Sequence, residues 1–125
     1  MNEKELLLKD LSARAIYHPV CSIYREDDLK IGWRDAELTG YFFDGSSYEF
    51  YFDCYSSVDN ILKIKPYLRP MSSMTEEEHK EYEQWLPDGY CIDIIDWLNK
   101  NHFDYRGLIP KGLALKAPKD MYKLN

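Results

Sequence analysis

The chain has 125 residues, 45% hydrophobic and 30% charged, which suits one globular domain spanning residues 1–125. Sixteen Lys and Arg against 22 Asp and Glu give a net charge of −6, and this disfavours nucleic-acid binding, which needs a basic surface. No apolar run reaches the roughly 20 residues that cross a bilayer, and the charged N-terminus is unlike a signal peptide. The composition therefore predicts a cytoplasmic protein without a membrane segment.

The first residues predict a helix followed by a strand. Asn2 and Glu5 have the spacing of a capping box. Apolar residues then recur at helical spacing, so a helix is expected over about Glu3–Arg14. The segment HPVCSIYRE changes to the alternation of a strand, which Pro19 precedes.

The next segment predicts an antiparallel meander. Leu29, Ile31 and Trp33 alternate with other residues in the period of a strand. Asp44-Gly45 lies between two aromatic-rich runs, which is a strong signal for a hairpin. No βαβ pattern precedes Pro66, so a parallel nucleotide-binding sheet is not expected.

The second half predicts two more helices between irregular segments. YSSVDN is interpreted as a polar loop and ILKIK as a short strand that ends at Pro66. In KPYLRPMSSMTEEE, Thr75 and Glu78 form a capping box for a helix up to Trp85. The segment YCIDIIDWLNKNH has one apolar stripe, from Cys91 to His102, and is expected to be helical. GLALKA is expected to add a short strand.

These elements together predict an α+β fold. It comprises an N-terminal helix, an antiparallel meander of about four strands that curls toward a small barrel, two later helices and an irregular C-terminal segment. Cys21, Cys54 and Cys91 are interpreted as reduced thiols because no CxxC pair occurs. The three His and three Cys match no zinc spacing, so neither a metal nor a cofactor is predicted.

The segment HFDYRG is the candidate for chemistry. His102, Asp104, Tyr105 and Arg106 could supply a base, an orienting carboxylate and an anion-binding guanidinium. The structural alternative, which we favour, is that His102 ends a helix, the next residue fills the core, and Asp104 and Arg106 pair or stay in solvent. Arg69 is the residue of the KPYLRP stretch that turn and capping signals leave unexplained. It is interpreted as a structural donor, or otherwise as a functional anchor.

Tyrosine makes up most of the aromatic excess, with 11 Tyr in the chain. On the second strand of the hairpin, Tyr48 shares one face with Phe50 and Phe52, and Tyr51 lies on the other face with Glu49. We expect helices to cover the Tyr-rich face. An open face would instead suit a protein partner, because Tyr is enriched in contact surfaces.

Three strings occur in an order that resembles a known group of proteins: LLLKDLSAR, KPYLRPMSSMTEEE and WLNKNHFDYRGLIPKGLALKAP followed by MY. They resemble a family of short uncharacterised proteins from gut anaerobic bacteria, often encoded in prophage-like or mobile regions. The resemblance covers about half of the chain and leaves out the central strands. The family has no established activity or ligand, so the resemblance implies a genomic setting and no site residues.

Three functions remain open on the sequence. The leading hypothesis is a non-enzymatic protein-binding module, because no specific catalytic motif is found and the chain is acidic and Tyr-rich. The second is a small enzyme or ligand-binding domain that uses Arg69 and the His102–Arg106 segment. The third is a nucleic-acid-associated or DNA-mimicking protein, which the scattered basic residues disfavour. The partner and the oligomeric state are not indicated.

Overall fold

The computed structural model of the protein describes residues 2–26, 31–53, 55–58, 60–86 and 92–122. The elements, in chain order, are helix α1 (Glu3–Arg14), strands β1 (Val20–Glu26), β2 (Ile31–Phe43), β3 (Tyr48–Phe52), β4 (Tyr55–Val58) and β5 (Ile64–Leu68), helices α2 (Glu76–Trp85) and α3 (Ile92–Lys100), and strand β6 (Leu115–Lys116). Short 3-10 helices occur at Ala15–Tyr17, Ile61–Lys63 and Met71–Ser73. The α+β class is confirmed.

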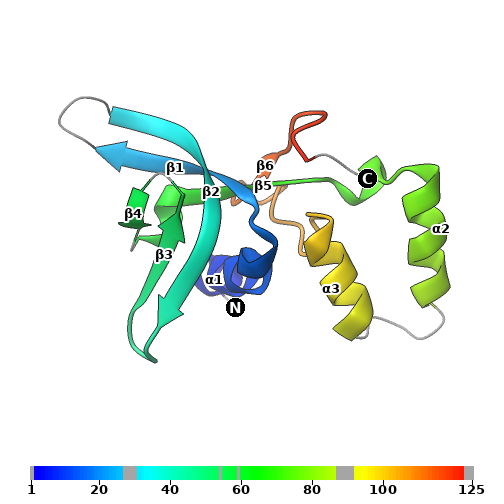
Figure 1. Ribbon diagram of the computed structural model, residues 1–125, viewed down its shortest axis with the longest axis horizontal. Helices are drawn as coiled ribbons and strands as arrows, with labels where there is room; N and C mark the ends of the chain where they lie inside the picture. Colours follow the sequence, from blue (N-terminus) through cyan, green and yellow to red (C-terminus); the bar gives the residue numbers. More distant parts are fainter. Residues whose placement is uncertain (1, 27–30, 54, 59, 87–91, 123–125) are drawn as a thin grey trace.

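The strands form one open sheet in the order β4-β3-β2-β1-β5-β6 (Figure 1). Neighbouring strands are antiparallel except β5 and β6, which pair in parallel through Tyr67 and Leu115. β4 and β6 lie at opposite ends of the strand order, so the sheet does not close. The expected curl toward a small barrel is therefore wrong.

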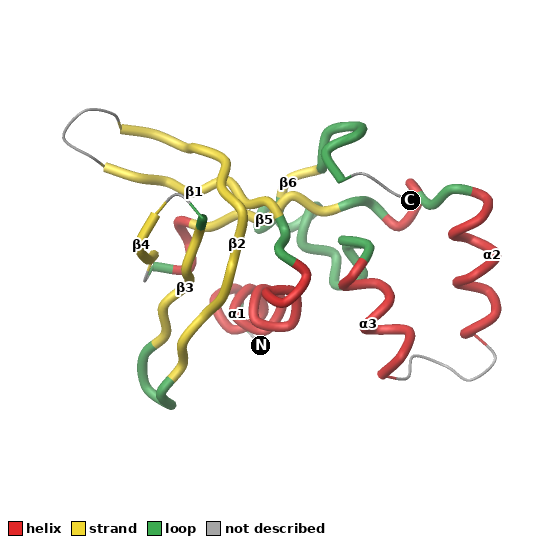
Figure 2. Tube along the Cα trace, in the orientation of Figure 1, coloured by secondary structure: helices red, strands yellow, loops and turns green. Residues whose placement is uncertain are grey.

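The core lies between α1 and one face of the sheet (Figure 2). Alternation along the strands turns Cys21 and Ile23 of β1, Leu38 of β2 and Phe50 of β3 to this face, where they are fully buried. α1 contributes apolar residues of the same cluster, Leu7 and Leu11. The helix thus covers the face on which Tyr48 and Phe50 lie.

Two segments differ from the interpretation of the sequence. YSSVDN contains β4, an edge strand that pairs with β3 through Val58 and Phe50, and is not a polar loop. ILKIK begins as the 3-10 helix Ile61–Lys63, and β5 starts only at Ile64. A short edge strand has one neighbour and needs no continuous apolar alternation, so its sequence carries little strand signal.

The helices follow the local signals closely. α1 begins at Asn2, whose Oδ1 accepts a hydrogen bond from the Glu5 N–H at 2.8 Å. α3 begins at Ile92 in the described part of the chain and ends at Lys100, so His102 lies beyond the helix.

The predictions for Cys54, Cys91 and the Pro87–Gly89 break fall outside the described residues. No described helix has both the length and the apolar character that crossing a membrane requires.

The capping box of α2 is complete. Thr75 Oγ1 accepts a hydrogen bond from the Glu78 N–H at 3.1 Å, and Glu78 Oε1 accepts one from the Thr75 N–H at 2.9 Å. Replacing Thr75 by Ala is expected to lower the free energy of unfolding by about 1 kcal/mol, because one N–H of the first turn loses its acceptor. Urea denaturation measures this change. Thr75→Ser keeps the hydroxyl and should retain most of the stability, and equal losses in both variants would contradict the capping role.

Candidate functional site

Arg69 lies at the end of β5 and is joined to the segment after α3 through its backbone. Its N–H donates to the His102 carbonyl at 2.7 Å, and its carbonyl accepts from the Asp104 N–H at 2.8 Å. This pairing continues as an isolated parallel bridge between Arg69 and Phe103. The structure therefore brings Arg69 and the HFDYRG segment together, although they are more than thirty residues apart in the sequence.

The Arg69 side chain is enclosed by structural contacts. Its two terminal nitrogens donate to the two carboxylate oxygens of Glu78 at 2.8 and 2.7 Å, and Nη1 also contacts the Asn101 carbonyl at 3.3 Å. The guanidinium lies 4.2 Å from the centre of the Phe103 ring. Partial burial alone would raise the pKa of Glu78, but the hydrogen bonds from Arg69 and from the Thr75 backbone lower it. Arg69 thus holds the start of α2 against the end of α3.

The residues that follow His102 also have structural partners. The Asp104 carboxylate accepts hydrogen bonds from the N–H groups of Leu108 and Ile109 at 2.8 and 2.9 Å, which closes the loop after α3. Tyr105 donates its hydroxyl hydrogen to Asn99 Oδ1 at 2.9 Å. These contacts leave neither side chain pointing freely into a pocket.

Arg106 takes part in a buried charged cluster with two residues that the sequence interpretation missed. Asp10 and Arg14 are fully buried, and Arg14 Nε donates to Asp10 Oδ2 at 2.8 Å. Arg106 Nε donates to the other oxygen of Asp10 at 3.2 Å, and Arg14 Nη2 donates to the Phe103 carbonyl at 2.7 Å. The sequence contains a signal for this cluster, because Asp10 and Arg14 lie on the same helical face as the apolar residue Leu7 and are therefore expected to be buried with it.

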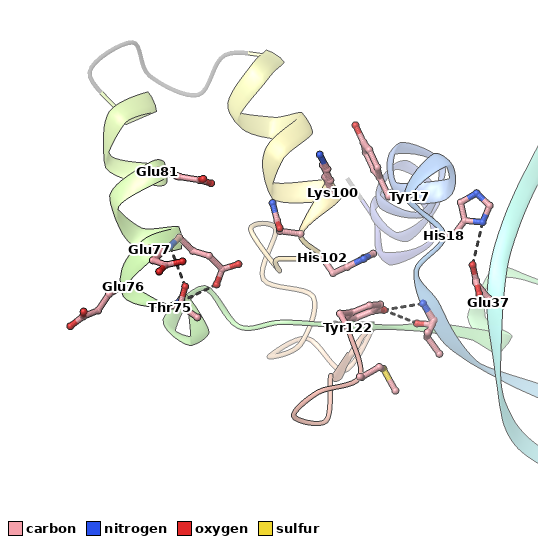
Figure 3. Close-up of a pocket in the computed structure, with 14 residues that line it drawn as sticks. Tyr17, His18, Glu37, Thr75, Glu76, Glu77, Glu81, Lys100, His102 and Tyr122 are labelled. Atoms are coloured by element: carbon pink, nitrogen blue, oxygen red, sulfur yellow. Dashed lines mark hydrogen bonds and ion pairs between the residues drawn. The ribbon is translucent and has the colours of Figure 1, made fainter. Parts of the chain in front are cut away.

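A cleft of about 1150 Å³ lies between the sheet and the α2–α3 pair (Figure 3). It is lined by segments from across the chain, and those labelled in the figure are Tyr17, His18, Glu37, Thr75, Glu76, Glu77, Glu81, Lys100, His102 and Tyr122. Of the residues predicted for a site, only His102 lines this cleft. Arg69 lies in an adjoining hollow of about 650 Å³, which shares Thr75 and Tyr122 with the cleft.

His102 lies at the base of the cleft in a backbone conformation with φ of 63°. Its imidazole is stacked on the Tyr122 ring, with centroids 3.7 Å apart, and only 8% of the residue is exposed. Burial, followed by the charges of Arg14 and Arg69, lowers the pKa of His102 to about 4. The imidazole is therefore neutral at pH 7, and its Nδ1 has no hydrogen-bond partner among the residues that the structure describes.

Hydrogen bonds hold Tyr122, the residue on which His102 is stacked, in place. Its hydroxyl accepts a hydrogen bond from the Val20 N–H at 2.9 Å and donates to the Tyr67 carbonyl at 2.8 Å. Burial raises the pKa of Tyr122 well above its ordinary value, so the hydroxyl stays protonated. Tyr122 was not predicted as a site residue, because a tyrosine in an irregular segment gives no local signal of its position in the fold.

One side of the cleft is rich in carboxylates. Glu76, Glu77 and Glu78 form the first turn of α2, where the positive end of the helix favours negative charge. Glu81, one turn later, accepts a hydrogen bond from the indole N–H of Trp97 at 2.9 Å. On the opposite side, Glu37 of β2 lies 3.3 Å from His18 Nδ1.

Tyr48 and Tyr51 lie away from this cleft and on different faces of β3. Tyr48 is half-buried, and its ring contacts the Phe50 ring with centroids 5.8 Å apart. The Tyr51 hydroxyl donates to Glu49 at 3.2 Å on the face opposite the core. The structure therefore does not combine the predicted tyrosines with His102 into one site.

The described residues do not supply an obvious catalytic group. The Cys21 thiol is fully buried, and burial raises its pKa, so it is not a reactive thiolate. Among the residues that the structure describes, no three His, Cys, Asp or Glu side chains are placed to hold a metal ion. Comparisons with protein-family models, curated proteins and solved structures find no match to this chain.

Proposed function

We propose that this protein is a non-enzymatic cytoplasmic module that binds another protein and is encoded by a phage or other mobile element. The observation that carries the proposal is the exposed aromatic end of β2. Tyr41, Phe42 and Phe43 are consecutive, and 45%, 54% and 54% of these residues are exposed. Exposed aromatic side chains gathered in one place are typical of protein contact surfaces.

A shallow groove extends this surface to α1. Tyr41 and Phe43 line a hollow of about 370 Å³ together with Leu8, and the charged side chains of Glu5 and Lys9 lie at its border. An apolar centre with a charged border resembles the arrangement of protein interfaces, in which large buried anchors contribute most of the affinity. Tyr41 and Phe43 connect the hairpin end to this groove, whereas Phe42, which pairs with Glu49 of β3, lies on the opposite face of the sheet.

The contacts of the candidate catalytic residues also favour a binding role. Arg69 pairs with Glu78, and Arg106 pairs with Asp10, so both guanidinium groups stabilise the fold. Asp104 accepts two backbone hydrogen bonds. The resemblance to short proteins of prophage-like regions supplies the genomic setting, in which a module of this size would act on proteins of the host.

Affinity capture from a lysate of the host tests the proposal. The double variant Phe42→Ser/Phe43→Ser is expected to lose the proteins that the unaltered chain captures, because it removes two exposed aromatic anchors. Its matched control is Ile16→Ser/Ile92→Ser, which alters two other exposed apolar residues, 73% and 79% exposed.

The control variant should capture the same proteins as the unaltered chain. A captured protein should then bind in purified form, with a dissociation constant that rises at least about tenfold in the hairpin variant. Capture that is equal for both variants, or the absence of any partner that binds in purified form, would remove the support for this function.

A further inference from the structure

The cleft between the sheet and the α2–α3 pair has an excess of negative charge. Among the described residues, five carboxylates line it, from Glu37, Glu76, Glu77, Glu78 and Glu81, against the ammonium group of Lys100. Glu78 among them is paired with Arg69. A concave surface lined by charges of one sign concentrates counter-ions of the other sign.

The base of the cleft adds an uncharged, electron-rich surface. His102 reaches into the space between Tyr17 and Tyr122 (Figure 3), and more than nine-tenths of the residue is buried. Its pKa of about 4 keeps the ring neutral, so the imidazole itself adds no positive charge to the base. Among the described residues its Nδ1 has no hydrogen-bond partner, and in the tautomer protonated on Nε2 this nitrogen is an acceptor for an N–H donor.

The aromatic rings match the same ligand chemistry. Tyr17 and Tyr122 also line the cleft, and the faces of tyrosine rings attract ammonium groups, although His102 covers one face of Tyr122. Carboxylates at the sides, aromatic faces at the base and an unpaired acceptor nitrogen are together the features of a site for organic cations. An anion would be repelled by the carboxylates.

From these observations we propose that the cleft binds an organic cation that carries alkylammonium groups. The volume of about 1150 Å³ accommodates an extended chain with more than one such group. Two sources share this chemistry, a free polyamine and the lysine side chains of an extended basic segment in a protein. The site is separate from the aromatic hairpin end, so it does not depend on the function proposed above.

Isothermal titration calorimetry at low ionic strength tests the site with two probes. Spermidine represents the free polyamine, and a peptide of six lysines represents the basic segment. Both are titrated into the unaltered protein, with a peptide of six glutamates as the probe of opposite charge. We expect binding of at least one cationic probe, weaker binding as salt is added, and no binding of the glutamate peptide.

A pair of matched variants locates the binding. Glu37→Gln/Glu77→Gln removes one carboxylate from each side of the cleft, whereas Glu3→Gln/Glu83→Gln removes two carboxylates that do not line it. The cleft variant should bind the cation about tenfold more weakly, because it loses two carboxylate–ammonium pairs, and the control variant should bind it within about twofold of the unaltered chain. NMR signals of the His102 ring should shift when the cation is added.

The outcomes separate the two sources and the proposal itself. Binding of spermidine alone assigns the site to free polyamines, and binding of the lysine peptide with cleft dependence assigns it to basic protein segments. If neither cation binds, or if the two variants weaken binding equally, the cleft is not a cation site. Both of those results would leave the hairpin surface, and the function proposed for it, unaffected.

Discussion

Replacement of Arg14 by methionine is expected to lower the free energy of unfolding by about 3–5 kcal/mol, which is typical for breaking a buried ion pair. Arg14 and Asp10 are both 0% exposed, and Arg14 also donates to the Phe103 carbonyl at 2.7 Å. Methionine keeps a similar volume but removes both hydrogen bonds. The Asp10 carboxylate would then be buried with Arg106 as its remaining cationic partner at 3.2 Å.

Chemical denaturation of the variant and of a matched control measures this effect. Lys9→Met makes a similar charge-to-methionine change on the exposed side of the same helix and should alter the free energy of unfolding by less than about 0.5 kcal/mol. If Arg14→Met were as stable as Lys9→Met, the buried cluster would not contribute to the fold in the way that its contacts indicate.

Lowering the pH from 7 to 4 is expected to remove about 3 kcal/mol of stability through His102 alone. The pKa of this imidazole is about 4 in the folded protein, against its ordinary value of 6.5. As the pH falls, the imidazole of the unfolded chain therefore takes up its proton at a higher pH than that of the folded chain, which favours unfolding. The contribution is fully present above pH 6.5 and is lost progressively as the pH falls toward 4.

Two asparagine variants isolate this contribution. His102 and His18 both have a left-handed backbone, with φ of 63° and 52°, and asparagine tolerates that conformation better than most residues. His102→Asn should reduce the dependence of the free energy of unfolding on pH between 4 and 6.5, whereas His18→Asn makes the same change at an exposed left-handed position and measures the effect of the asparagine itself. An unchanged slope in His102→Asn would show that the imidazole is not held neutral by the fold.

The helices and the central hairpin could be predicted because their signals are local. Asn2 caps α1, Thr75 and Glu78 cap α2, and Asp44-Gly45 lies in the turn between β2 and β3. Each signal acts between residues that are neighbours in the chain. The bounds expected for the first two helices, residues 3–14 and 76–85, are those observed.

The edge strand and the cleft could not be predicted in this way. β4 is a strand because β3 offers it hydrogen bonds, and its own residues, YSSV, do not require that conformation. The cleft is formed by segments around Tyr17, Glu37, Thr75, His102 and Tyr122, which only the tertiary fold brings together. His102 was predicted as a site residue because Asp104, Tyr105 and Arg106 follow it in the sequence. Those three residues stabilise the loop, and the residues that line the cleft with His102 come from other segments of the chain.

The contacts of Tyr122 have a consequence for how the protein folds. Its hydroxyl joins β1 to β5 across sequence separations of 102 and 55 residues, and Arg14 reaches Phe103 across 89 residues. A chain emerging from the ribosome therefore lacks these contacts until Phe103 and Tyr122 have been made. Closing such long loops is slow, so we expect the first strands to stay incompletely packed during this period, when they are open to chaperones and to aggregation.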